Sequence, residues 1–259
     1  MNVTIIGSGN LAWHLAPALD NTDYHIREVY SRKRSHAEAL AERLYGARVH
    51  DTLDFSGSSS RIFIIAVADD AITDVVHNVI LPNDAVLLHT SGSQPLNLLA
   101  YAATSRIGVF YPLQTFTKSR KVDFQDVPVF IESADSQTEK ILVHMGRAIS
   151  KKVHSISSSD RRSLHLAAVF ASNFTNHMLA LSKDVIEKTD LKFEWLKPLI
   201  AETINKSLTL GPEAAQTGPA KRGDLEILDM HLAMLQNDPA LAEIYRVISQ
   251  NIVDRYDEG

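Results

Sequence analysis

The 259-residue sequence contains no cysteine. Disulfide bonds, thiolate nucleophiles and cysteine-ligated zinc or iron–sulfur centres are therefore excluded. The sequence also lacks a run of about 18 consecutive apolar residues, so we expect no transmembrane helix and no membrane partner. The N-terminal stretch has no basic region of a secretory signal, and Gly7 and Gly9 interrupt its apolar run. These absences predict a cytoplasmic protein.

An excess of positive charge is missing too. The formal net charge is −5, with 22% charged and 45% hydrophobic residues, which is typical of a globular protein. We therefore expect no nucleic-acid partner. The sequence also lacks H-E-x-x-H, G-x-x-x-x-G-K-[ST], G-x-S-x-G and a tyrosine followed four positions later by lysine. The eleven histidines show no metal-ligand spacing, so no metal is expected.

Up to about residue 153, apolar strands alternate with helices. Strands are expected at 3–6, 25–30, 48–50, 62–67, 85–89, 107–110, 127–132 and 152–156. Helices are expected at 10–19, 35–45 (capped by Ser35), 69–80 and 136–149. This alternation predicts an α/β fold with a Rossmann-like, doubly wound, mostly parallel sheet covered on both faces.

The strand signal ends after residue 157, and helices are expected at about 160–189, 193–209, 224–236 and 239–254. The first contains LHLAAVFASNFTNHMLAL, which is apolar on nearly every face and predicts a helix buried on all sides. We therefore expect an α/β domain at 1–155, followed by an all-helical C-terminal domain at 156–259.

The first expected strand leads directly into a glycine-containing turn with the pattern G-x-G-x-x-[GA], and a helix follows. The first glycine permits a tight turn, the second lets the backbone approach a pyrophosphate, and Ala12 is small enough for helix and strand to pack. The free N–H groups of the helix would face the phosphates. A simple tight turn is the alternative, but the strand–turn–helix context favours a dinucleotide site at Gly7, Ser8, Gly9, Asn10 and Leu11.

The end of the second strand indicates which dinucleotide binds. NAD-dependent proteins usually place a carboxylate there, about 20 residues after the glycines, to hold the ribose 2′-hydroxyl. Here the residues are Ser31, Arg32 and Lys33, followed by Arg34. A hydroxyl and cations suit a 2′-phosphate, because arginine can bind it with two hydrogen bonds. This favours NADP over NAD, although a solvated basic loop would have the same composition.

Two further strand ends should meet the cofactor, because ligands of such sheets bind outside the carboxyl ends of the strands. Small residues at Ala66, Val67 and Ala68 would let the ribose and nicotinamide lie close. The turn His89-Thr90-Ser91-Gly92-Ser93 would place Thr90 at the cofactor and Ser91 and Gly92 at a substrate carboxylate or phosphate. An ordinary serine–glycine loop explains this turn equally well.

These stretches carry a resemblance that covers nearly the whole chain. GSGNLA, YSR, HTSGS, GVFYPLQTF, the helix with SN and TGPAKRGD resemble a family of bacterial NADP oxidoreductases. In that family a Rossmann-like domain precedes a helical domain similar to the 6-phosphogluconate dehydrogenase C-terminal fold. The wider superfamily includes ketopantoate reductase, pyrroline-5-carboxylate reductase, β-hydroxyacid dehydrogenases and deazaflavin-dependent NADP reductases. The resemblance implies a site between the domains and a homodimer formed through the helical domains.

One departure concerns the proton donor. Ketopantoate reductase and the hydroxyacid dehydrogenases carry a lysine four residues before an asparagine on the long helix. Here Val169 precedes Asn173 at that spacing, and no lysine lies between Lys152 and Lys183. A carbonyl or imine reductase still needs a proton donor near the atom that receives the hydride.

His165 is the best titratable candidate on this helix. With 100° of rotation per residue around a helix, His165 lies on one polar stripe with Ser172, Asn173 and Asn176. Buried polar groups need hydrogen-bond partners, which a cleft would provide. This gives His165, Asn173 and Ser91 as catalytic candidates, although a hydrogen-bonded core histidine is about equally plausible. Gln114 and Arg222 join Asn176 as substrate contacts. Arg222 could equally belong to a charged surface loop, and His89 could support its turn.

The sequence therefore predicts an NADP-dependent oxidoreductase that transfers a hydride between nicotinamide and a small anionic carbonyl or imine compound bound between the domains. The alternative is an NADP(H)-binding sensor or interaction protein without catalysis, which the missing lysine favours.

Overall fold

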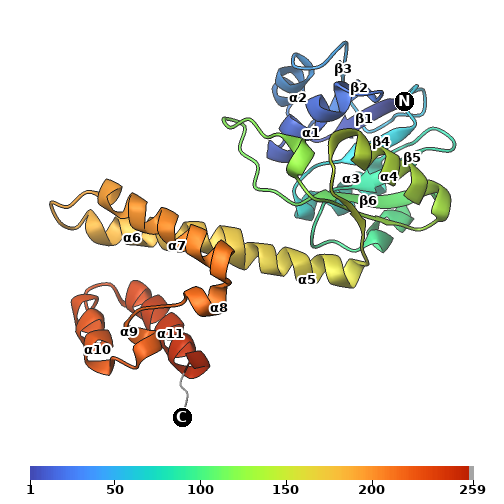
Figure 1. Cartoon of the computed structure of the whole chain (residues 1–259). Coiled ribbons are helices and arrows are strands. Elements are labelled where there is room, and N and C mark those ends of the chain that lie inside the picture. Colours follow the sequence, from blue (N-terminus) through green and yellow to red (C-terminus); the bar gives the residue numbers. More distant parts are fainter. Residues whose placement is uncertain (257–259) are drawn as a thin grey trace. The chain divides into compact units, whose positions relative to one another are not determined.

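The computed structural model describes residues 1–256 and divides the chain into two compact units, 1–172 and 173–259. An eight-stranded sheet lies in the first unit (Figure 1). Its strands are β1 Asn2–Ile6, β2 His25–Tyr30, β3 Arg48–His50, β4 Ile62–Ile65, β5 Val86–His89, β6 Ile107–Pro112, β7 Val129–Ser133 and β8 Val153–Ser155. Their positions agree with the sequence prediction to within two residues at nearly every end.

The strand order is β3-β2-β1-β4-β5-β6-β7-β8. All neighbouring strands are parallel except β6 and β7, which pair antiparallel. The order reverses between β1 and β4, and this switch point is where doubly wound sheets bind their ligands. The predicted Rossmann-like, mostly parallel sheet is confirmed.

Helices cover both faces of the sheet. Successive side chains of β4 point to opposite faces and pack into two different hydrophobic cores. Ile62 and Ile64 pack with α1 (Asn10–Asp20), α2 (Arg34–Ala41) and α4 (Ser136–Ile149). Phe63 and Ile65 pack on the other face with α3 (Asp69–Asn78) and the short 3₁₀ helix η1 (Leu96–Tyr101). A strand buried on both sides must be apolar at every position, which explains the continuous IFII run.

Two local predictions were wrong. The N-cap of α2 is Lys33, so Ser35 lies inside the first turn of the helix rather than capping it. The long helix after Ser157 is also not α-helical throughout. It runs as α5 (Ser158–Ala168), a π-helical turn η3 (Val169–Phe174) and α6 (Thr175–Ile186). Since a π-turn is wider than an α-turn, the angles calculated for the polar stripe do not hold across it.

The expected burial of this helix on all sides is also wrong for the single chain. Leu166 in α5 is 59% exposed, and the side chains of α6 are at most partly buried. The division between the units falls inside η3, whereas the sequence boundary at residue 155 follows the end of the last strand at Ser155.

The second unit, considered by itself, is helical. After α6 comes the 3₁₀ helix η4 (Phe193–Leu196), whereas the 3₁₀ helix η2 (Phe124–Asp126) precedes β7 in the first unit. The remaining helices are α7 Lys197–Leu210, α8 Pro212–Ala215, α9 Pro219–Arg222, α10 Leu225–Met234 and α11 Pro239–Tyr256. Within residues 1–256, no helix combines the length and hydrophobicity needed to cross a membrane.

Candidate active site and cofactor cavity

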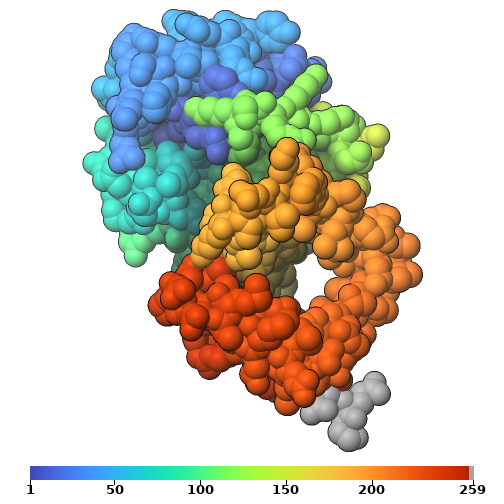
Figure 2. Space-filling view, turned by 90° about the vertical axis from the view of Figure 1, so that its left-hand side faces the viewer, coloured from blue at the N-terminus to red at the C-terminus, as the bar shows by residue number. Residues whose placement is uncertain are grey.

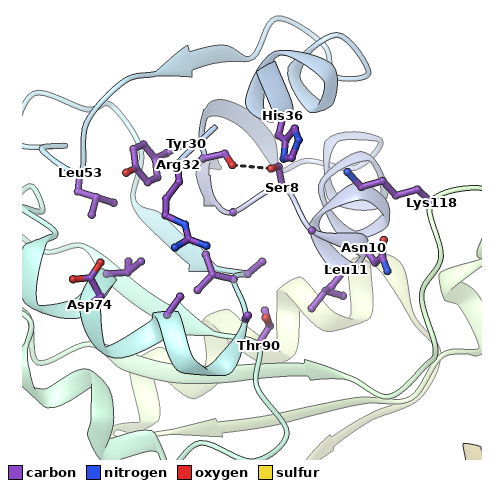
Figure 3. A pocket seen from close by; sticks show the side chains of 18 residues that line it. Ser8, Asn10, Leu11, Tyr30, Arg32, His36, Leu53, Asp74, Thr90 and Lys118 are labelled. Carbon is purple, nitrogen blue, oxygen red and sulfur yellow. Dashed lines mark hydrogen bonds between the residues drawn. The ribbon is translucent and has the colours of Figure 1, made fainter. Parts of the chain in front are cut away.

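A cavity of about 500 Å³ opens at the carboxyl ends of β1, β2, β4 and β5. The predicted cofactor residues that line it come from all four strand ends (Figure 3). They are Gly7, Ser8, Gly9, Asn10, Leu11, Ser31, Arg32, Ala66, Val67, Ala68 and Thr90. The cavity therefore sits at the switch point of the sheet.

The glycine turn has the geometry that a phosphate site needs. Gly7 has φ +120°, and a Cβ there would lie 2.3 Å from the carbonyl oxygen of Ala66, so only glycine fits. Gly9 is the N-cap of α1, so the helix begins directly at the cavity. Ala12 is fully buried, as the packing of helix against strand requires. Turn and helix together would direct backbone N–H groups at an anion bound in the cavity.

The basic residues after β2 have separate environments. The Ser8 hydroxyl donates to the Ser31 hydroxyl at 2.9 Å, which ties the glycine turn to the end of β2. Arg32 extends into the cavity in Figure 3. Arg34 points to Asp51 and Glu38 and forms ion pairs with both. Lys33 lies at the N-cap of α2, outside the set of lining residues, so its cofactor contact stays a prediction.

Sequence reasoning missed four titratable side chains that line the cavity: Tyr30, Asp74 and the two basic residues His36 of α2 and Lys118. Lys118 lies in the loop that follows β6. In Figure 2 this green loop lies in front of the dark blue N-terminal residues. The loop is fastened to α1 because His14 Nε2 lies 3.0 Å from the carbonyl oxygen of Thr117 and its ring stacks on Phe116. The Lys118 ammonium lies 4.7 Å from the ring centre of Trp13.

The turn after β5, residues 89–93, is held by its own side chains. The Ser91 N–H donates to Nδ1 of the buried His89 at 3.1 Å. Burial, together with the positive charge of Arg161, lowers the pKa of His89 to about 4, so this ring is neutral at pH 7. The Ser91 hydroxyl oxygen accepts from the N–H groups of Ser93 and Gln94. His89 therefore supports the turn, which is the structural role left open by the sequence.

Arg161 is a buried charged residue beside the turn after β5 that the sequence analysis did not single out. It is fully buried, donates from Nη1 to the Ser91 carbonyl at 2.8 Å and forms an ion pair with Glu132 of β7 at 2.9 Å. The Ser158 hydroxyl also donates to Glu132. A buried pair of this kind is costly to break on one side only. It joins the start of α5 to the turn after β5.

His165 of α5 lies in the same region of the first unit. Its Nδ1 is 3.0 Å from the hydroxyl oxygen of Tyr111, which is near the end of β6. A Cβ at Gly92 would lie 2.6 Å from His165 Nδ1 and 2.8 Å from Tyr111 Cζ. The predicted residues Ser91, Gly92 and His165 are thus brought together, and Tyr111 joins them.

The other predicted site residues have different surroundings. Gln114 follows β6, and its side-chain oxygen accepts from the Thr115 N–H at 2.8 Å. Asn173 and Asn176 are exposed residues of the second unit. Arg222, at the end of α9, forms an ion pair with Asp224 at 3.0 Å. The catalytic and substrate roles assigned to these residues remain predictions.

A doubly wound sheet with a glycine-turn cavity at its switch point defines a dinucleotide-binding protein. Residues 2–90 match the family model described as "NADP oxidoreductase coenzyme F420-dependent", and residues 127–252 match "Domain of unknown function (DUF2520)". No curated protein matches the chain.

Several solved structures are similar to the chain over nearly its whole length. A Bacteroides fragilis protein provisionally assigned as an NADP oxidoreductase is 37% identical over 98% of both chains, with a TM-score of 0.88. An imine reductase of Streptomyces aurantiacus is 17% identical over 99% of this chain and 95% of its own, with a TM-score of 0.66. A reductive aminase of Aspergillus terreus, in complex with NADPH and ethyl levulinate, is 16% identical over 100% of this chain and 94% of its own, with a TM-score of 0.72.

The chain belongs to the family of NADP oxidoreductases in which an NADP-oxidoreductase domain precedes a DUF2520 domain. It is an oxidoreductase of an NADP-dependent family, and NADP is its cofactor, as the sequence predicted. The two more distant reductases show the fold alone.

Proposed function

We propose that this protein is an NADPH-dependent reductase of a small anionic carbonyl or imine compound. The observation that carries the proposal is the continuity of the cofactor cavity with the turn after β5. Thr90 lines the cavity, and Gly92, two residues later, is in contact with Tyr111 and His165. Titratable side chains therefore lie at the strand ends where a nicotinamide would be placed.

The cofactor residues fit the group that the family implies. Bound NADPH supplies a hydride at its nicotinamide ring. In this chain the glycine turn would hold the pyrophosphate, and Ser31 and Arg32 would hold the 2′-phosphate. Small side chains at Ala66 and Ala68 would leave room beside the ring. The cavity's own shape supports this, because Gly7 has no space for a side chain.

The substrate side of the proposal follows the sequence prediction. Cofactor binding is assigned to residues 1–155, and substrate and dimer contacts to residues 156–259. The substrate would be held between these two domains, where Asn173, Asn176 and Arg222 would bind its polar groups. An anionic substrate is proposed because Arg222 would offer it a cation.

We also propose a homodimer formed through the helical domain. Large apolar side chains are exposed on its helices, with Leu199 at 64%, Leu208 at 83% and Met234 at 74%. The unit also contains an apolar cavity of about 420 Å³ lined by residues of α6, α10 and α11, including Met178, Leu228 and Ile244. Exposed apolar surface of this extent is typical of an interaction surface.

Turnover tests the catalytic proposal. The purified protein is mixed with NADPH and with pyruvate, 2-oxoglutarate, Δ1-pyrroline or Δ1-pyrroline-5-carboxylate, and the NADPH absorbance is followed. We expect saturable oxidation of NADPH with at least one of these probes. Tight NADPH binding without oxidation by any of them would favour the alternative of a sensor without catalysis.

A further inference from the structure

The pair formed by Tyr111 and His165 has the geometry of a proton donor and its support. Tyr111 is a buried residue of β6, and its hydroxyl oxygen is 3.0 Å from Nδ1 of His165. The two rings meet edge to face at 72°, with their centres 6.0 Å apart. Two side chains that are 54 residues apart in the chain are thus fixed against each other by a hydrogen bond and a ring contact.

The pair is also fixed against the turn after β5. Gly92 touches both rings so closely that a methyl group in its place would overlap them. Ser91, the preceding residue, is held from the other side by the buried guanidinium of Arg161. The turn, the tyrosine and the histidine therefore form one rigid cluster, and Thr90 of the same turn lines the cofactor cavity.

The cluster lies at the same edge of the sheet as the cofactor cavity. β4, β5 and β6 are consecutive parallel neighbours, so their carboxyl ends share one edge. Ala66 to Ala68 and Thr90, at the ends of β4 and β5, line the cavity, and Tyr111 lies at the end of the next strand. No lysine lies between Lys152 and Lys183, so α5 and η3 offer no ammonium group as a proton donor.

We propose that Tyr111 is the catalytic proton donor of this reductase and that His165 positions and reprotonates it. This rests on the proposed reductase function. The carbonyl or imine carbon accepts a hydride with its two electrons, the C=O or C=N π-bond breaks, and its oxygen or nitrogen takes the proton from Tyr111 Oη. The tyrosinate takes the proton of His165 Nδ1 while His165 Nε2 takes one from solvent, so the ring stays neutral overall. Burial raises the pKa of Tyr111, so the hydroxyl is protonated at neutral pH.

The chain contains a matched control for this pair. Tyr24 and His144 form the same hydrogen bond, with Tyr24 Oη 2.8 Å from His144 Nδ1. Tyr24 directly precedes β2, at the opposite end of the strands from the cavity. Tyr24→Phe therefore removes a hydroxyl from a buried tyrosine that is hydrogen-bonded to a histidine, without touching the proposed site.

The experiment compares Tyr111→Phe and Tyr24→Phe with the wild type, using a probe that the wild type reduces. We expect Tyr111→Phe to lower kcat by about 100-fold or more, the range of general acid catalysis, with an unchanged Kd for NADPH. Tyr24→Phe should keep the wild-type kcat. A Tyr111→Phe protein with kcat within twofold of the wild type would overturn the proposal, and so would equal losses in both variants.

A second measurement does not need turnover. In ¹⁵N NMR spectra of the histidine rings, Tyr111→Phe should change the Nδ1 signal of His165, and Tyr24→Phe only that of His144. An unchanged His165 signal in Tyr111→Phe overturns the pair whether or not a substrate is found. Absence of turnover by the wild type, with the NMR change present, would instead count against the proposed reductase function.

Discussion

At the scale of single residues, the three consecutive cations after β2 are not equivalent. Arg32 lines the cofactor cavity, whereas Arg34 is held by Asp51 and Glu38. We expect Arg32→Ala to weaken NADPH binding by about 10- to 100-fold, the value of a hydrogen-bonded ion contact, and to change NADH binding little. Arg34→Ala, the matched control, should leave both unchanged. Fluorescence titration with each cofactor measures this, and equal losses for NADPH and NADH would refute the assignment.

His89 leads to a prediction about pH. Its pKa is lowered from 6.5 to about 4 in the folded protein, first by burial and then by Arg161. Between these values the unfolded chain binds a proton that the folded protein does not, so His89 destabilises the fold as the pH drops from 6.5 to 4. Above pH 6.5 this effect is absent.

The measurement is urea unfolding of the wild type and of His89→Gln, whose side-chain oxygen can still accept from the Ser91 N–H. Between pH 7 and pH 5, the free energy of unfolding should fall more steeply in the wild type, approaching a tenfold difference in the unfolding constant per pH unit below 6.5. Parallel pH profiles for the two proteins would show that His89 is not titrated on unfolding.

At the scale of elements, sequence periodicity predicted nearly all strands and helices of the first unit, because each is encoded by its own neighbours in the chain. Gly7 was placed correctly in a tight turn for the same local reason. The antiparallel pairing of β6 with β7 was not predicted, since strand direction depends on the route of the connection between them. The π-turn at 169–174 was also not predicted, because the apolar pattern of the helix continues through it.

At the scale of the whole molecule, the exposed apolar surface of the helical unit bears on assembly. Leu208 of α7 is 83% exposed in the single chain. If a second copy covers it, Leu208→Arg should convert a dimer into a monomer in size-exclusion chromatography with light scattering, because a charge would be buried without a partner. Thr203→Arg adds the same charge at an exposed position on the side of α7 away from Leu208 and should stay dimeric. A monomeric wild type would refute the dimer.

Sequence and tertiary structure thus decided different parts of the site. The glycine turn, the NADP cofactor and the order of the elements were determined by the sequence alone, because they depend on residues that are close in the chain. The partnership of Tyr111 with His165, and that of Arg161 with Glu132 and Ser91, could be decided only by the tertiary structure. Such contacts depend on which strand ends share an edge and on where α5 begins, and no local pattern records either.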